Sequence, residues 1–345
     1  MKVLIATKNL HSDSKIRGIG VYARELSQAL ARQFPQDSFP LGQSVSSTPD
    51  LDLIHYPFFD PFFLTLPIHK KIPTVVTIHD LIPLKYPAHY PVGVRGKLKW
   101  LRQKRQAQKA AHIITDSTAS KSDITSILGI DESKISVIPL GPEKTKVSAE
   151  LTRKTKLEYN LPHRYLLYVG DINWNKNIIG LVQAFAGLDA PSTHLVLVGK
   201  SFSNESNIPE SRAVHRAIKD SGKADKIHLL GFVPTHHLPA IYSHATLYVQ
   251  PSWDEGFGLP VLDAMSRGCP VATSNRGSLP EVGGRSVAYF DPDKDMLEVL
   301  SNLLASPEKR KQLAKSGLAR AKQFSWELAA IETRKVYEKV IADYS

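Results

Sequence analysis

Residues Pro251–Met265 carry the sequence PSWDEGFGLPVLDAM, in which two carboxylates flank a glycine-rich turn. The apolar run Leu247–Val249 before it predicts a buried strand, and the apolar spacing after Gly258 predicts a helix. Backbone N–H groups and the positive end of a helix dipole gather at such a junction, which favours a bound phosphate. Glu255 lies in the turn and Asp263 about two helical turns further on, so both can face one pocket. This layout predicts a site for a phosphorylated sugar donor, with Glu255 toward the sugar hydroxyls and Asp263 toward a ribose.

The length and composition of the chain limit its fold class. Its 345 residues are too many for one average domain and fit two domains of roughly 150 residues each. No apolar run approaches the ~20 residues that cross a bilayer, and strand-like residues follow Met1 without a signal-peptide pattern. The single cysteine, Cys269, cannot form an internal disulfide and has no metal-ligand spacing around it. We therefore expect a cytoplasmic protein.

Much of the formal charge of +11 is carried by one basic segment, residues 95–109. No acidic residue lies between Asp80 and Asp116, and Trp100 and two leucines are interleaved with the basic side chains. One interpretation is an amphipathic helix that binds an anionic membrane, at the inner face of the plasma membrane. The other is a solvated helix that packs a few apolar residues on its own domain. We expect no nucleic-acid partner, because the segment lacks the aromatic platforms or reading helix that such a partner needs.

Short apolar runs alternate with helical patterns along the whole chain. The strands expected in the first half are 2–6, 51–55, 74–79, 112–115 and 135–139, with helices at 21–33 and 95–109. Those expected in the second half are 165–169, 194–198, 227–230, 246–249, 270–273 and 287–290, with helices near 179–185 and at 259–266. This alternation predicts two α/β, doubly wound domains with parallel sheets, whose ligands bind at the carboxyl ends of the strands. The expected domains are 1–150 and 151–325, with a polar linker in 141–161 and an amphipathic helix at 326–345.

Further motifs follow three of the expected strands. Gly18 and Gly20 come after the first strand and a polar loop, and they let backbone approach a ligand closely. A nicotinamide site is not favoured there, because the tight turn and third glycine of that fingerprint are absent. His79 ends another strand at the expected cleft edge, and Asp80 beside it can orient it, contact the acceptor or cap the next turn. Lys176 follows the first strand of the second half, as a point charge suited to a diphosphate.

The stretch that begins at Glu255 closely resembles the signature of the retaining glycosyltransferases of family 4, which have the GT-B fold. That signature has a Glu, then Gly-Phe-Gly-Leu-Pro, then a second Glu eight positions after the first, where this chain has Asp263. The resemblance runs from Gly18 to the terminal Phe324–Glu327. It implies two Rossmann-like domains that face each other across a cleft, the first on the acceptor side and the second for the nucleotide-sugar donor. It also implies that the C-terminal helix crosses back to the first domain.

The resemblance implies roles for single residues. The loop at Gly18 lies over the donor phosphates, His79 contacts the transferred sugar, and backbone near Val233 reads the base edge. Glu255 and the turn after it hold the sugar, while Lys176 stabilises the departing diphosphate. The expected catalytic residues are Glu255, His79 and Lys176. The expected donor-binding residues are Gly18, Gly20, Lys176, Val233, Gly256, Phe257, Gly258, Leu259 and Asp263.

One phosphate contact of the family is missing from this sequence. Many members carry an Arg directly after the glycine that corresponds to Gly170, whereas this chain has Asp171. Lys15, Arg17 or backbone amides are the alternatives for that contact.

These observations predict a glycosyltransferase that moves a hexose from a nucleoside diphosphate sugar to a hydroxyl of a glycan or lipid-linked acceptor, with retention. GDP-mannose is the expected donor, because residues 77–83 and 176–178 resemble mannosyltransferases of bacterial surface polysaccharides. UDP-glucose and UDP-N-acetylglucosamine remain alternatives, as does a sugar-nucleotide epimerase of the same fold, which needs no acceptor. A hydrolytic carboxylate pair fits less well, because Glu255 and Asp263 lie across a phosphate-type turn. We expect no cofactor and no metal, and we interpret Asp291-Pro292-Asp293 as a turn with a helix cap.

Overall fold

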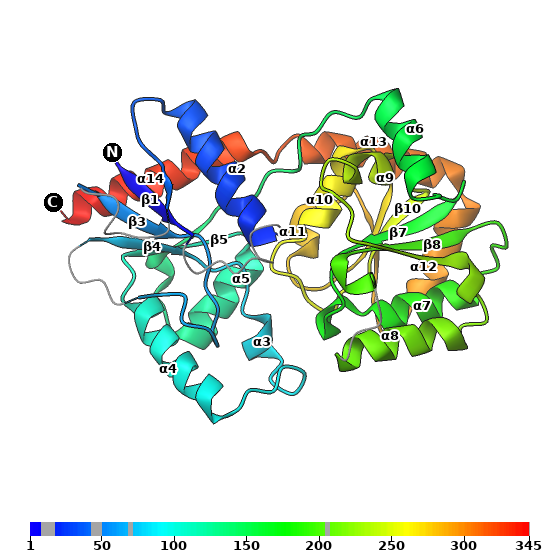
Figure 1. The fold of residues 1–345 in the computed structure, drawn as a ribbon, viewed down its shortest axis with the longest axis horizontal. Coiled ribbons are helices and arrows are strands. Elements are labelled where there is room, and N and C mark those ends of the chain that lie inside the picture. Colours follow the sequence, from blue (N-terminus) through cyan, green and yellow to red (C-terminus); the bar gives the residue numbers. More distant parts are fainter. Residues whose placement is uncertain (8–17, 43–49, 68–71, 204–207, 345) are drawn as a thin grey trace. The chain divides into compact units, whose positions relative to one another are not determined.

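The computed structural model describes residues 1–7, 18–42, 50–67, 72–203 and 208–344. The chain divides into two compact units (Figure 1): unit 1 is Met1–Gly141 with Phe324–Ser345, and unit 2 is Pro142–Gln323. The division at 141/142 lies upstream of the 150/151 boundary expected from the sequence. No helix within the described ranges combines the length and the apolar character needed to span a bilayer.

Unit 1 contains a six-stranded sheet in the order β2-β1-β3-β4-β5-β6, and all its strand pairs are parallel. Helices α2 and α14 contact each other on one side of the sheet, and α4 and α5 lie on the other (Figure 1). The strands are β1 (Val3–Ala6), β2 (Leu41–Gly42), β3 (Leu53–Tyr56), β4 (Thr74–Thr77), β5 (His112–Thr115) and β6 (Ile135–Val137). The helices are α2 (Gly18–Gln33), α3 (Ile82–Lys85), α4 (Val94–Gln108), α5 (Thr118–Asp123) and α14 (Trp326–Tyr344).

Apolar residues at helical spacing explain why α14 belongs to unit 1. Ala329, Ala330, Val336 and Val340 are all buried and lie on one side of the helix, which packs along α2. Tyr337 on the same side is also fully buried. The C-terminal helix therefore completes the first domain, as the resemblance to the GT-B fold implies.

Unit 2 contains a second parallel sheet, in the order β12-β11-β10-β7-β8-β9. Helices α7, α8 and α12 cover one face, and α9 and α10 cover the other (Figure 1). The strands are β7 (Tyr165–Val169), β8 (His194–Val198), β9 (Ile227–Gly231), β10 (Leu247–Gln250), β11 (Val271–Ser274) and β12 (Ala288–Phe290). The helices are α6 (Ala149–Glu158), α7 (Ile178–Gly187), α8 (Pro209–Asp220), α9 (Leu238–His244), α10 (Leu259–Ser266), α11 (Leu279–Gly283), α12 (Met296–Ala305) and α13 (Pro307–Ala321).

The strand order of unit 2 identifies where a ligand binds. Counted from β7 as the first strand, the order is the 3-2-1-4-5-6 of dinucleotide-binding domains. Its direction reverses between β7 and β10, which pair directly with each other. In such sheets the ligand crevice opens at the carboxyl ends of these two strands.

The structure corrects two details of the sequence interpretation. The expected linker contains helix α6, which Ser148 caps by accepting a hydrogen bond from the Leu151 N–H at 3.0 Å. Helix α2 begins at Gly18, so Gly18 and Gly20 lie in its first turn rather than in a loop before it. The sequence analysis missed the two-residue edge strand β2, because a run that short shows no periodicity.

Candidate functional site

Lys176 and Glu255 meet at the carboxyl ends of β7 and β10. The Lys176 Nζ donates to Glu255 Oε1 at 2.8 Å and to Oε2 at 2.7 Å. The lysine side chain is 21% exposed and the glutamate 8%. The structure thus brings together the two residues that the sequence analysis selected independently, at the switch point of the sheet.

Two further polar residues orient the Glu255 carboxylate. Gln250 Nε2 and Ser252 Oγ each donate to Glu255 Oε1 at 2.7 Å, and the Tyr248 hydroxyl donates to Gln250 Oε1. Because these groups are buried, the carboxylate is held in one orientation before any ligand binds. The sequence analysis missed Gln250 and Ser252, although a glutamine at the end of an apolar strand was a visible signal.

Hydrogen bonds join the two loops that carry Lys176 and Glu255. The Trp253 N–H donates to the Asn175 carbonyl at 2.7 Å, and Asn175 Nδ2 donates to the Asp254 carbonyl at 3.0 Å. Asn177 Nδ2 donates to the Pro251 carbonyl at 3.1 Å. The loops therefore form one rigid support for the site.

Glycines allow the turn after Glu255 to pass close to its neighbours. Gly258 has φ +100°, and a Cβ there would lie 2.9 Å from Leu279 Cδ2. A Cβ on Gly277, at φ +56°, would lie 2.4 Å from Asp254 Oδ1 and 2.8 Å from the Glu255 nitrogen. Only glycine combines this conformation with this space. Gly256 and Phe257 are buried in the same turn, and Leu259 is the first residue of α10.

Asp263 on α10 has partners within unit 2. Its Oδ1 accepts the Glu143 N–H at 2.8 Å, and Arg267 binds the Glu143 carboxylate at 2.7 Å. Burial raises the pKa of Asp263 to about 7, against the opposing effect of the Glu143 N–H. The carboxylate expected at a ribose thus also holds the start of the unit 2 chain.

The loops after β8 and β9 pack closely on the loop after β7. A Cβ on Gly199 would lie 1.9 Å from the Gly170 carbonyl oxygen, and the Gly199 N–H donates to the Gly231 carbonyl at 2.9 Å. Val233, which the sequence analysis placed near the base, is buried just after β9. Asp171 in the first of these loops accepts a hydrogen bond from Ser201 at 3.2 Å.

In unit 1, His79 pairs with a carboxylate that the sequence analysis did not select. Its Nδ1 lies 2.5 Å from Asp116 Oδ2, and its Nε2 lies 3.2 Å from the Pro57 carbonyl oxygen. Asp116 follows β5, the strand next to β4, so its place after a strand was the available signal. Asp80 accepts the Ile82 N–H at 3.1 Å at the start of α3, and its charge also raises the pKa of His79.

The surroundings of the His79 ring favour its protonated form. Both ring nitrogens face oxygen acceptors, which only the doubly protonated imidazole satisfies. Burial lowers the pKa of His79, but the Asp116 carboxylate outweighs burial, so the pKa is raised overall. His79 is therefore suited to supply positive charge rather than to accept a proton.

The side chains considered for the missing phosphate contact, Lys15 and Arg17, lie outside the described residues. Within the described ranges, no three His, Cys, Asp or Glu side chains are grouped to hold a metal ion. Asp291 and Asp293 both lie within 3.3 Å of Arg276, in the turn before α12.

Comparisons with known proteins cover both units. The family described as Glycosyl transferases group 1 matches residues 151–320, and Glycosyltransferase Family 4 matches residues 32–143. O-antigen chain mannosyltransferase B of Escherichia coli is 32% identical over 78% of this chain and 71% of that protein. An MMP alpha-(1->4)-mannosyltransferase of Mycolicibacterium hassiacum is 27% identical over 98% of each protein. A sucrose-phosphate synthase from Thermosynechococcus elongatus superimposes with a TM-score of 0.76 at 21% identity, over 99% of both chains.

Proposed function

This chain belongs to the group 1 glycosyltransferases of family 4, and from that premise we propose that it moves mannose from GDP-mannose to a hydroxyl of a glycan acceptor, with retention at the anomeric carbon. The chain is a glycosyltransferase with the GT-B fold. The names of both relatives support mannose as the transferred sugar. UDP-glucose and UDP-N-acetylglucosamine are the alternative donors.

The observation that carries this proposal is the Lys176–Glu255 pair at the switch point of unit 2. The ammonium group neutralises the diphosphate that departs when the glycosidic bond breaks, and this interaction strengthens as the charge develops. Glu255 then accepts hydrogen bonds from the sugar hydroxyls, supported by Gln250 and Ser252. The first turn of α10 adds the positive end of its dipole.

The proposed reaction needs no covalent intermediate. The bond between the anomeric carbon and the diphosphate oxygen breaks, and the acceptor oxygen bonds to the same face of that carbon. The acceptor proton passes to the departing phosphate oxygen. This step is inferred from the family resemblance, as is the contact of His79 with the sugar. In the structure, Asp116 is the hydrogen-bond partner that orients His79.

Nucleotide binding without metal tests the proposal. Purified protein in EDTA is heated with GDP, UDP or ADP and with their sugar conjugates. We expect GDP and GDP-mannose to raise the melting temperature, since a ligand at 100 times its Kd stabilises a protein by about 2.7 kcal/mol. Stabilisation by UDP alone would change the assigned donor, a requirement for Mg²⁺ would contradict metal independence, and no response would contradict the function. Isomerisation of the donor without an acceptor, followed by NMR, would favour the epimerase.

We also propose that the acceptor is lipid-linked and that α4 lies on an anionic membrane. The apolar side chains of Val94, Leu98 and Leu101 are 75%, 63% and 51% exposed, at the spacing of one helix face. Gln103 and Ala107 on the opposite face are buried. The helix thus presents a valine and two leucines to solvent among basic residues, which supports the membrane interpretation. It also packs Trp100 and Ala107 on the core of unit 1, as the other interpretation expects.

Liposome binding tests the membrane proposal. We expect the protein to sediment with vesicles that contain anionic lipid at low salt, and Leu98→Glu with Leu101→Glu to reduce this binding at least tenfold. Leu157→Glu, at an exposed leucine of α6, is the matched control. Absence of binding by the wild-type protein, or equal binding by the double variant, would refute the proposal.

A further inference from the structure

Two tryptophans flank the Lys176–Glu255 pair on the same two loops. Trp174 lies two residues before Lys176, and Trp253 lies two residues before Glu255. Their ring centroids are 6.5 Å apart with planes inclined by 19°, and both rings are partly exposed. They therefore form a stacked pair that presents an aromatic surface on the two loops of the candidate active site.

This surface lines a cavity of about 330 Å³ in unit 2. The side chains of Ile178 and Val214 form part of its apolar wall, while Asn173 and Glu210 add polar groups. An apolar wall with a few polar groups is typical of a small-molecule site. The loops beneath the tryptophans are tied by the Trp253–Asn175 and Asn177–Pro251 hydrogen bonds, so the surface exists before a ligand binds.

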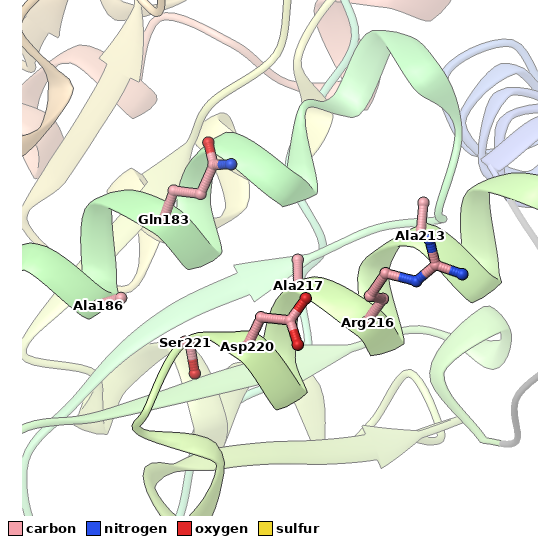
Figure 2. A pocket seen from close by; sticks show the side chains of 7 residues that line it. All are labelled: Gln183, Ala186, Ala213, Arg216, Ala217, Asp220 and Ser221. Atoms are coloured by element: carbon pink, nitrogen blue, oxygen red, sulfur yellow. The ribbon is translucent and has the colours of Figure 1, made fainter.

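The cavity continues along α7 and α8. Ala213 lines both it and a second cavity of about 470 Å³, shown in Figure 2. In Figure 2, Gln183 and Ala186 come from α7, and Ala217 and Asp220 come from α8. Small alanine side chains leave room between the helices, and polar side chains border that room.

The charge of this groove indicates the kind of ligand. The second cavity has one basic and one acidic side chain, Arg216 and Asp220. Among the described residues that line the first cavity, Glu210 is the one charged residue. The groove is thus nearly neutral, unlike the basic helix α4, and does not favour a polyanion. A sugar chain fits this chemistry, because the C–H faces of its rings pack on indole and its hydroxyls bond to amides and carboxylates.

We propose that Trp174 and Trp253, with the groove between α7 and α8, bind a neutral oligosaccharide segment of the acceptor glycan. This inference rests on the proposed function, since it places a growing chain beside the transfer site. The combined cavities exceed the lower bound for a ligand pocket, which suits a segment of more than one sugar.

Oligosaccharide binding to the intact protein tests the proposal. Mannotetraose and cellotetraose serve as neutral probes, titrated against wild type, Trp174→Leu, Trp253→Leu and Trp253→Phe by calorimetry. Tyr344→Leu removes an exposed aromatic ring of unit 1 as the control. Thermal melting establishes that each variant is folded, and GDP and UDP binding are measured in parallel.

We expect at least one tetrasaccharide to bind wild type and the control equally. Each Leu variant should weaken that binding about tenfold, and Trp253→Phe should retain most of it, because the aromatic face is kept. Nucleotide binding should not change. The proposal would be overturned if wild type bound no saccharide, or if both Leu variants bound the saccharide as tightly as wild type does. Nucleotide binding would still support the transferase in either case. Loss of nucleotide rather than saccharide affinity would overturn it by assigning the rings to the nucleobase.

Discussion

Units 1 and 2 both end their parallel strands in polar residues, but the surroundings of those residues differ. In unit 2, Lys176 and Glu255 pair where the strand order reverses, and their side chains are 21% and 8% exposed. In unit 1, His79 and Asp116 follow β4 and β5, away from a reversal of strand order, and their side chains are 18% and 3% exposed. The two ion pairs are thus similarly buried and differ in their place in the sheet, since the unit 2 pair lies where the ligand crevice of a doubly wound sheet opens.

A buried polar chain lies beside the His79–Asp116 pair of unit 1. The Tyr337 hydroxyl lies 2.6 Å from His55 Nδ1, and Thr77 Oγ1 lies 2.7 Å from His55 Nε2 and 2.8 Å from the Tyr22 hydroxyl. The centroids of the Tyr22 and His79 rings are 4.8 Å apart, with their planes nearly perpendicular. The chain connects α14, β3, β4 and α2, so the C-terminal helix helps to set the surroundings of His79.

The largest expected effect tests whether the pair in unit 2 is catalytic. Lys176→Ala should reduce kcat/KM by about 10²- to 10³-fold, because the charge on the departing diphosphate loses its partner. Steady-state transfer from GDP-mannose measures this, with Lys294→Ala at an exposed unit 2 lysine as the control. Turnover like that of wild type in Lys176→Ala would show that the pair supports the fold of unit 2 and not the reaction.

The next effect tests whether Asp116 holds His79 as a cation. Asp116→Asn should reduce kcat about tenfold and move the alkaline limb of the pH profile to lower pH, because the pKa of His79 falls when the carboxylate is lost. Asp131→Asn, at an exposed unit 1 carboxylate that accepts the Ser133 N–H, is the matched control. An unchanged pH profile in Asp116→Asn would show that the charge of His79 is not used.

A smaller effect tests the buried chain of unit 1. Tyr337→Phe leaves a buried ring nitrogen of His55 without its partner and should cost about 1–3 kcal/mol of stability. Hydrogen exchange should locate the loss in α14 and β3, with α7 and β7 of unit 2 unchanged. Equal loss in both units would contradict the separation of their cores.

The smallest effect is an opposite response of the two units to acid. Burial, with the charge of His79, lowers the pKa of His55 to about 3 from an unfolded value of 6.5, so unit 1 loses stability as pH falls below 6.5. The pKa of Asp263 is raised to about 7 from 3.8, so unit 2 gains stability as pH falls from 7 toward 4. Between pH 7 and 5 we expect unit 1 to lose about 2 kcal/mol. We expect unit 2 to gain about 1 kcal/mol, discounted for the partial exposure of Asp263.

Hydrogen exchange, corrected for its intrinsic pH dependence, resolves the two responses. His55→Gln should reduce the acid sensitivity of unit 1 and leave the part that His112 contributes. Asp263→Asn should remove the gain of unit 2 in acid and leave the opposite contribution of His228 and His237, whose pKa values burial lowers. Parallel responses of both units would contradict the assigned pKa directions.

Much of the fold could be predicted from local pattern. The expected bounds of β5, β7, β8 and α10 agree with the structure, because continuous apolar runs and a glycine before a helix mark their ends. The two-residue β2 and the polar helix α6 could not be recognised in this way, since neither has a strong apolar period.

By itself, the sequence determined the residue types at the strand ends and hence Lys176, Glu255 and His79 as candidates. Only the tertiary structure decided their partners. Lys176 and Glu255 are 79 positions apart, and His79 and Asp116 are 37 apart. Parallel strands bring the ends of such distant segments together, and the register that aligns them depends on packing of the whole sheet rather than on local sequence. The tryptophan surface of unit 2 exists for the same reason.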